Sequence, residues 1–309
     1  MDPRFSPHNM HWQHPELFTT LDPHLNALGG LPLVYRFPLL DNLPRDAHGV
    51  YAITGGRQVG KTTLLKQFMA DLLRDGVNPA AITYLPGELL DDHHALVKAV
   101  GDILELQKSG DAGTTFMIVD EVTYIKEWDR GVKYLADAGF LRNAVLILTG
   151  SDSVVIRDAW TRLPGRRGRA DRVDFHLFPL TFAEFVSLKK NMHQVAVRRL
   201  SEGPADSAEL VAAETLFDSY LVHGGYLTAI NDFESRGEIP RATFSTYGDW
   251  IRGDVLKRGK QEHYLREVLE AILRRAGSQL TWNTLVADLS IDHPATVADY
   301  VGLLSRMDA

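Results

Sequence analysis

The chain has 309 residues, of which 45% are hydrophobic and 24% are charged, and its formal net charge is -7. This balance is typical of globular proteins and leaves room for more than one domain, while the negative charge argues against a protein that coats nucleic acid with its whole surface. The sequence contains no cysteine, which excludes disulfides, thiolate metal sites and a cysteine nucleophile and fits a reducing cytosol.

The sequence also argues against a membrane partner. The N-terminus has no apolar segment of the kind found in signal peptides, and no apolar run approaches the roughly 18 residues that a membrane-spanning helix needs. We therefore expect a soluble, cytoplasmic protein.

Residues 1–46 are predicted to form an N-terminal arm. They are rich in histidine, proline and aspartate and lack a sustained hydrophobic period. His8, His11 and His14 recur at intervals of three, but no carboxylate stands at metal-ligand spacing beside them. We interpret the segment as a loosely ordered polar arm that leads into the main domain.

Residues 47–180 are predicted to be an α/β core. Short apolar runs are typical of buried parallel strands with helices on both faces. We assign five of them: Val50–Thr54, Ala81–Leu85, Phe116–Val119, Val145–Leu148 and Val173–Phe178. Between the first two, apolar residues at helical spacing predict a helix that ends near Gly76. Alternating strands and helices indicate a parallel sheet covered by helices.

The segment after the first strand matches the phosphate-loop pattern G-x-x-x-x-G-K-[ST], between a strand and a helix as that motif requires. Its glycines let backbone N–H groups point at phosphate oxygens, and the following helix adds its positive dipole end. Lys61 is suited to reach the β- and γ-phosphates, and the Thr62 hydroxyl to ligate Mg²⁺. The predicted ATP-binding residues are Gly55, Gly56, Arg57, Gln58, Val59, Gly60, Lys61, Thr62 and Thr63.

A second motif closes the third strand, where Asp120 and Glu121 follow a run of buried residues. Ligand-facing side chains of a doubly wound sheet lie at such strand ends. Asp120 is suited to hold Mg²⁺, directly or through water, together with Thr62. Glu121 is suited to polarise the water that attacks the γ-phosphate, so the catalytic candidates include Glu121 and Lys61.

Two further segments carry candidates for catalysis. Thr149 and Ser151, after the fourth strand, could sense the γ-phosphate or orient water, and an ordinary turn explains them equally well. The stretch Arg157–Arg172 contains six arginines and only two acidic residues. It could supply an arginine to the γ-phosphate in cis or from a neighbouring subunit, bind nucleic-acid phosphates, or be a solvated basic loop. Arg166 is our candidate catalytic arginine.

Residues 181–262 are predicted to be a helical lid, and residues 263–309 an incomplete winged-helix-like or helix-turn-helix segment. Thr181 and Glu184 have the spacing of a capping box at the start of the lid. The tail shows three short helical patterns joined by tight connections. Residues 280–309 contain four aspartates and one arginine, which favours protein contact or internal packing over DNA binding.

Taken together, these motifs resemble the bacterial and archaeal AAA-type ATPases that are often followed by a C-terminal domain of unknown function. The matching runs are GGRQVGKTT at Gly55, IVDEVTYIKEW at Ile118, LILTGSDS at Leu146, LPGRRGR at Leu163, FPLTFAEF at Phe178 and YLVHGGY at Tyr220. The resemblance covers residues 15 to 305. It implies strand order 5-1-4-3-2, a helical lid and a winged helix, and in many members a further domain that looks like a nuclease, before which this chain ends. Leu227 stands where the family has a proline near the adenine.

The sequence thus predicts ATP binding and Mg²⁺-dependent ATP hydrolysis coupled to a conformational change. The alternative is an ATP-dependent switch that turns over slowly or not at all and recruits a protein or nucleic-acid partner. A GTPase is disfavoured because the sequence lacks an Asn-Lys-x-Asp motif. A small-molecule kinase shares the phosphate loop but rarely pairs it with Asp-Glu on a third strand. Self-association is a further possibility that the sequence leaves open.

Overall fold

The computed structural model describes residues 2–107, 113–163, 165–189, 207–287 and 289–308. The chain forms two compact units, Met1–Ser235 and Arg236–Ala309. The segment 181–262, predicted as one lid, therefore contributes helices to both units. In the described part of the chain, no helix has the length and apolar character needed to cross a membrane.

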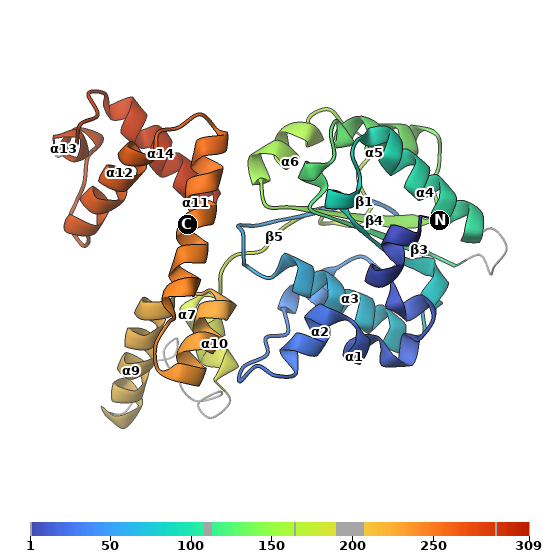
Figure 1. The fold of residues 1–309 in the computed structure, drawn as a ribbon, viewed down its shortest axis with the longest axis horizontal. Helices are drawn as coiled ribbons and strands as arrows, with labels where there is room; N and C mark the ends of the chain where they lie inside the picture. The colour runs from blue at the N-terminus through green and yellow to red at the C-terminus, as the bar shows by residue number, and fades with distance from the viewer. Residues whose placement is uncertain (1, 108–112, 164, 190–206, 288, 309) are drawn as a thin grey trace. The chain divides into compact units, whose positions relative to one another are not determined.

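The first unit is built on a parallel sheet of five strands (Figure 1). The strands are β1 (Gly49–Thr54), β2 (Ile82–Pro86), β3 (Thr115–Asp120), β4 (Ala144–Gly150) and β5 (Asp174–His176). Their order is β2-β3-β4-β1-β5, which confirms the order implied by the resemblance. The fifth strand is shorter than predicted because only three of its residues pair with β1.

Helices cover both faces of the sheet, as predicted from strands that are apolar along their whole length (Figure 1). Alternate residues of β1 point to opposite faces: Val50 and Ala52 join one core, and Tyr51 and Ile53 the other. The first core is closed by α4 (His93–Gln107), α5 (Trp128–Asp137) and α6 (Ser153–Trp160). The second is closed by α3 (Lys61–Arg74), with α1 (Phe18–Leu21) and α2 (Pro23–Leu28) beside it.

Short 3₁₀ helices connect these elements and begin the chain. They are Pro3–His8, Met10–Trp12, Pro15–Leu17, Pro38–Asn42, Pro79–Ala81, Gly87–Leu89 and Val122–Tyr124. Four of these seven begin at proline, whose fixed φ suits the first position of a helix and whose missing N–H is not needed there.

The prediction of a loosely ordered N-terminal arm is wrong, because this segment covers the free edge of β2. The Asn9 amide donates to the Tyr84 carbonyl at 2.8 Å, and its oxygen accepts from the Tyr84 N–H at 2.7 Å. Trp12 donates its indole N–H to the Ile82 carbonyl at 2.8 Å, and His11 Nε2 lies 2.9 Å from the same oxygen. The segment thus satisfies backbone groups that an exposed edge strand would leave unpaired.

After the sheet, the first unit continues in α7 (Phe182–Leu188), α9 (Ser207–His223) and α10 (Leu227–Arg236). The predicted capping box is present at the start of α7. Thr181 Oγ1 accepts from the Glu184 N–H at 3.3 Å, and Glu184 accepts from the Thr181 N–H at 2.8 Å. Leu180 and Phe185 lie in one buried cluster with Ile230, so the start of α7 is fixed against α10.

The second unit contains α11 (Arg241–Lys257), α12 (Glu262–Arg274), α13 (Trp282–Val286) and α14 (Pro294–Arg306). The three helices expected in the tail are therefore present. Leu265 and Val268 of α12 pack with Val297 and Tyr300 of α14, whereas Leu273 of α12 is 75% exposed. Whether this unit is the beginning of a winged helix stays a prediction.

Burial of His11 makes the stability of the first unit sensitive to pH. The side chain is fully buried, and burial lowers the pKa of His11 from 6.5 to about 4. Below pH 6.5 the unfolded chain binds a proton that the folded protein rejects, so stability falls as the pH drops towards 4 and then levels off. Between pH 7 and pH 5 we expect His11 to account for a loss of about 2 kcal/mol.

Urea unfolding of the wild type and of His11→Gln at pH 7 and pH 5 gives the free energy of unfolding at each pH. The glutamine side chain keeps an N–H donor near the Ile82 carbonyl. The variant should lose about 2 kcal/mol less than the wild type between the two pH values. His14→Gln, at an exposed position of the same segment, should keep the wild-type loss. Equal losses in all three proteins would contradict a neutral, buried His11.

Candidate functional site

The phosphate loop joins β1 to α3 and depends on two glycines. Gly60 has φ 99°, a left-handed conformation, and a Cβ there would lie 2.7 Å from the ring of Phe37. At Gly55, with φ 154°, a Cβ would overlap the carbonyl of Leu177. Only glycine fits these positions without displacing its neighbours, so the loop is held tightly between β5 and the segment before β1.

Lys61 is the first residue of α3 and lies inside this loop. Its ammonium donates to the carbonyl oxygens of Gly55 at 3.0 Å and Gly56 at 2.8 Å. It also lies 3.6 Å from Glu121 Oε1. Burial lowers the pKa of Lys61, and the nearby Glu121 and Asp120 oppose that shift. The lysine and the two predicted carboxylates therefore belong to one electrostatic group.

Asp120, at the end of β3, accepts hydrogen bonds from three hydroxyl groups. Thr62 Oγ1 donates to Oδ2 at 2.7 Å, and the Tyr84 hydroxyl donates to the same oxygen at 2.5 Å. Thr149 donates to Oδ1. The carboxylate is buried, and each donor comes from a different element, namely α3, β2 and β4. Burial and the Asp120 carboxylate both raise the pKa of Tyr84, so the phenol keeps its proton as a donor.

Glu121 follows Asp120 in a left-handed backbone conformation, with φ 52° and ψ 52°. Such a conformation is costly for a residue with a Cβ and is common where a functional side chain must be aimed. Its N–H donates to Thr149 Oγ1 at 2.9 Å, and its Oε2 accepts from the Ser151 N–H at 3.0 Å and hydroxyl at 3.2 Å. The side chain is 24% exposed, so solvent water reaches it.

The topology explains why these residues meet. β4 lies between β1 and β3, and the three strands are parallel. Their carboxyl ends therefore lie together at the carboxyl-terminal end of the sheet. Thr149 is fully buried and links Asp120 to the backbone of Glu121, which makes it a support of the two carboxylates. Ser151 is the residue after β4 that contacts Glu121 directly.

The structure does not bring Arg166 to the phosphate loop of its own chain. The Gly168 N–H donates to the Val50 carbonyl at 2.9 Å, which places this segment at the beginning of β1, while the phosphate loop follows its end. Arg166 Nε donates to Asp137, the last residue of α5, at 2.5 Å. A contact between Arg166 and a neighbouring subunit stays a prediction.

Other arginines of the same stretch also have partners within the chain. Arg162 pairs with Asp129 at 3.0 Å, and Arg167 pairs with Asp174. The Arg167 guanidinium also lies 4.8 Å from the centroid of the Trp160 ring. These contacts hold the segment between β4 and β5 against the core, which gives its basic residues a structural role.

The Gly224-Gly225 pair lies against the start of α7. The Leu180 N–H donates to the Gly225 carbonyl at 2.8 Å, and a Cβ at Gly225 would overlap the backbone of Leu180. Leu227, in place of the family's proline, is the first residue of α10. Its carbonyl accepts from Asn231 at 3.0 Å. The pair thus fixes how α9 and α10 meet the end of the sheet.

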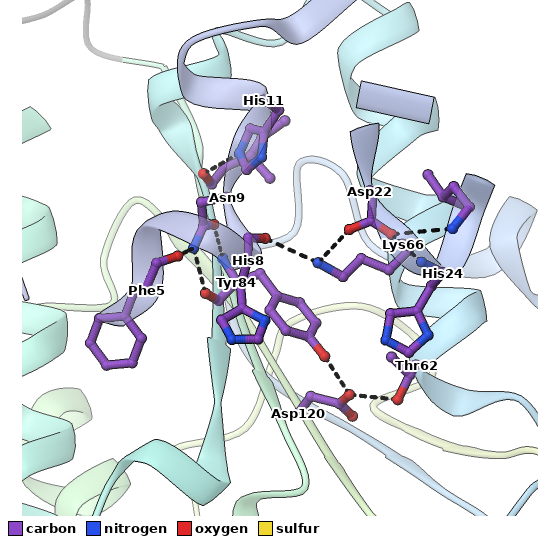
Figure 2. A network of polar contacts seen from close by, with 12 residues as sticks. Phe5, His8, Asn9, His11, Asp22, His24, Thr62, Lys66, Tyr84 and Asp120 are labelled. Atoms are coloured by element: carbon purple, nitrogen blue, oxygen red, sulfur yellow. Dashed lines mark hydrogen bonds and ion pairs between the residues drawn. The ribbon is translucent and has the colours of Figure 1, made fainter. Parts of the chain in front are cut away.

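Sequence reasoning missed Tyr84 and the buried ion pair between Lys66 and Asp22, both shown in Figure 2. Tyr84 stands in an apolar strand where an aromatic residue is ordinary. Lys66 lies five residues after Lys61 on α3, in a pattern that resembles a solvated helix face. The one sequence feature that could have indicated a buried Lys66 was its place between Leu65 and Phe68, which are both buried.

Comparison with known proteins finds similarity over part of the chain. Residues 47–186 match the family described as AAA domain. An uncharacterized protein of Haemophilus influenzae is 23% identical over 272 residues, which cover 85% of this chain and 61% of that protein. This chain therefore spans about three-fifths of the length of that relative.

Three solved structures show limited overall similarity to this chain. The Walker-type ATPase of Pyrococcus abyssi is 16% identical with a TM-score of 0.48, over 87% of this chain and 86% of that one. The Aeropyrum pernix ORC1 protein in complex with DNA is 13% identical with a TM-score of 0.37, over 97% and 84%. AMPPCP-bound DnaA of Aquifex aeolicus is 16% identical with a TM-score of 0.32, over 86% and 84%.

The family match covers the parallel sheet, the phosphate loop and both carboxylates. Residues 47–186, a little under half of the chain, are thus similar to the AAA domain.

Proposed function

We propose that this chain binds ATP with Mg²⁺ and hydrolyses it. The observation that carries the proposal is the meeting of Lys61, Thr62, Asp120 and Glu121 at one edge of the sheet. These four side chains come from two segments nearly sixty residues apart in sequence, since Thr62 and Asp120 differ by 58 positions. A glycine turn that only starts a helix would not explain this convergence.

The phosphate loop supplies the binding groups. The N–H groups at the start of α3 and the positive end of its dipole favour the negatively charged phosphates. Lys61, held beside the loop carbonyls, is placed to exchange its contact with Glu121 for phosphate oxygens. Gly60 and Gly55 allow the close approach that this cradle needs.

The donor set near Thr62 fits magnesium. Thr62 Oγ1 and Asp120 Oδ2 are 2.7 Å apart, so a hydroxyl and a carboxylate oxygen already lie side by side. Hard oxygen ligands of this kind are what Mg²⁺ prefers, with phosphates and water completing its coordination. When bound, the ion would neutralise charge on the phosphates, while Asp120 and Thr62 hold it.

Glu121 is the proposed base that orients the attacking water. Its carboxylate is partly exposed and adjacent to Lys61, which the phosphates would contact. Ser151 holds one carboxylate oxygen through two hydrogen bonds and Thr149 holds the Glu121 backbone, so the group is aimed from both sides. Hydrogen bonding and position together make Glu121 suited to general-base assistance.

We further propose that nucleotide binding is coupled to the helices after the sheet. Thr54 Oγ1 contacts His176 Nδ1 at 2.9 Å, and Leu177 lies against Gly55, only a few residues before α7 begins. A change in the loop would be transmitted through this contact towards α7. A slow switch that recruits a protein or nucleic-acid partner uses the same contact and differs only in its rate of turnover.

Glu121→Gln separates hydrolysis from binding. The amide keeps the size of the side chain but loses the basic carboxylate, so we expect turnover to fall by about 10²- to 10⁴-fold while ATP affinity stays close to the wild-type value. Steady-state phosphate release with Mg²⁺ and calorimetric ATP binding measure the two quantities. Glu16→Gln, an exposed glutamate of the N-terminal segment, should retain both.

Turnover in Glu121→Gln equal to that of the wild type would rule out Glu121 as the base. Tight ATP binding without measurable turnover in either protein would favour the switch over the enzyme.

Lys61→Ala tests the phosphate loop itself. Removing the ammonium deletes charge-assisted hydrogen bonds to the phosphates, so ATP affinity should fall by at least about 10-fold. Lys98→Ala, which removes an exposed lysine of α4, should bind ATP as the wild type does. Unchanged affinity in Lys61→Ala, measured by the same calorimetry, would contradict phosphate binding at this loop.

A further inference from the structure

Tyr84 contacts the magnesium candidate Asp120 from the edge strand of the sheet. In the pairing of β2 with β3, Pro86 is opposite Asp120 and Tyr84 is opposite Ile118. Residues two apart on a strand point to the same face, so the Tyr84 side chain shares a face with Asp120 and its long ring spans the interval between them. Its hydroxyl reaches Oδ2 at 2.5 Å.

That oxygen is the one to which Thr62 also donates, at 2.7 Å. Tyr84 therefore acts on the carboxylate oxygen that faces the phosphate-loop threonine. Thr149 engages the other oxygen, so the carboxylate is held from both sides. A carboxylate held in this way keeps one orientation, whereas a buried carboxylate with fewer donors would rotate about its Cβ–Cγ bond.

The Tyr84 ring lies against Lys66 of α3, which is in turn held by the N-terminal segment (Figure 2). The Lys66 ammonium lies 3.7 Å from the ring centroid, within the range of a cation–π interaction. Lys66 pairs with Asp22 at 3.0 Å and donates to the His8 carbonyl at 3.0 Å. Because both members of the ion pair are about 2% exposed, this contact is shielded from solvent and from salt.

We propose that Tyr84 is a positioning residue of the magnesium site, which fixes the Asp120 carboxylate beside Thr62 and is held in place by Lys66, Asp22 and His8. The inference rests on the proposed function, because it assigns a role within the same Mg²⁺·ATP site. It extends that site to the N-terminal segment, which the phosphate-loop motifs do not include. Partners that orient a ligating carboxylate commonly change metal affinity by about 10- to 100-fold when they are removed.

Tyr84→Phe tests the proposal because it deletes one hydroxyl and keeps the ring under Lys66. Binding of an ATP analogue that is not hydrolysed is measured by calorimetry in EDTA and over a series of MgCl₂ concentrations. In the wild type, Mg²⁺ should increase the affinity for the analogue. We expect the Mg²⁺ concentration at which half of this increase is reached to be about 10-fold higher in the variant. Binding in EDTA should equal that of the wild type, because the phosphate loop is unchanged.

Tyr51→Phe is the matched control. Tyr51 is also a buried tyrosine of the sheet, and its hydroxyl donates to the Ala47 carbonyl at 2.5 Å, near the start of β1. Its removal deletes a similar hydrogen bond away from the carboxylates, so the Mg²⁺ dependence should match the wild type. Melting temperatures of the two variants show whether loss of stability alone has any effect on binding.

An unchanged Mg²⁺ midpoint in Tyr84→Phe would overturn the positioning role. A loss of affinity that is equal in EDTA and in MgCl₂ would also overturn it, because it would indicate a general structural effect. If the affinity of the wild type for the analogue did not depend on Mg²⁺, the proposed metal site itself would be contradicted. That result can be distinguished from a failure confined to Tyr84.

Discussion

The Asp120 carboxylate is the group on which the arrangement of the site depends. A charged group taken out of water carries a large free-energy cost unless hydrogen bonds replace its hydration. Here the replacement comes from hydroxyl groups of α3, β2 and β4, which all lie around the end of β3 in the folded unit. These elements must therefore be in place before this charge is satisfied, which ties this part of the fold to the geometry of the site.

The N-terminal segment supplies hydrogen-bond partners to buried polar groups at the edge strand β2. Asn9 and Trp12 bind the backbone of β2, and the Lys66–Asp22 pair holds the segment against α3. A buried ion pair gains little net stability, because desolvation of both ions offsets their attraction. We infer that its effect here is one of specificity, because an alternative position of the segment would remove Asp22 from the buried Lys66. The segment that covers the edge strand is thus also the one whose Asp22 and His8 hold Lys66 beside the ring of Tyr84.

Features encoded by local sequence patterns could be predicted from the sequence alone. The phosphate loop and the Asp120–Glu121 pair follow from contiguous residues, and each strand was recognisable because burial on both faces makes it apolar throughout. The capping box of α7 depends on two residues three apart, so it too was predicted. The strand order came from the family resemblance, since short apolar runs carry no information about which strands are neighbours.

Features that depend on long-range placement could not be predicted in this way. Arg166 was a reasonable catalytic candidate by composition, but the return of the chain to the beginning of β1 places it beside Asp137. The N-terminal segment lacks a hydrophobic period because it contacts a strand edge through individual polar side chains, such as Asn9 and His11. Such contacts have no repeat to detect.

Helix α3 explains how the N-terminal segment and the phosphate loop both act on the Asp120 carboxylate. It carries Lys61 at its first residue and Lys66 five residues later, and at 3.6 residues per turn these side chains point in different directions. Lys61 faces the loop and Glu121, while Lys66 faces Asp22 and the ring of Tyr84. Both lysines are buried; burial lowers the pKa of each, and a nearby carboxylate opposes that shift. Because Thr62 lies on the same helix and also contacts Asp120, a shift of α3 would move the loop, the threonine and the support of Tyr84 together. Helix α3 thus connects the N-terminal segment to the phosphate loop.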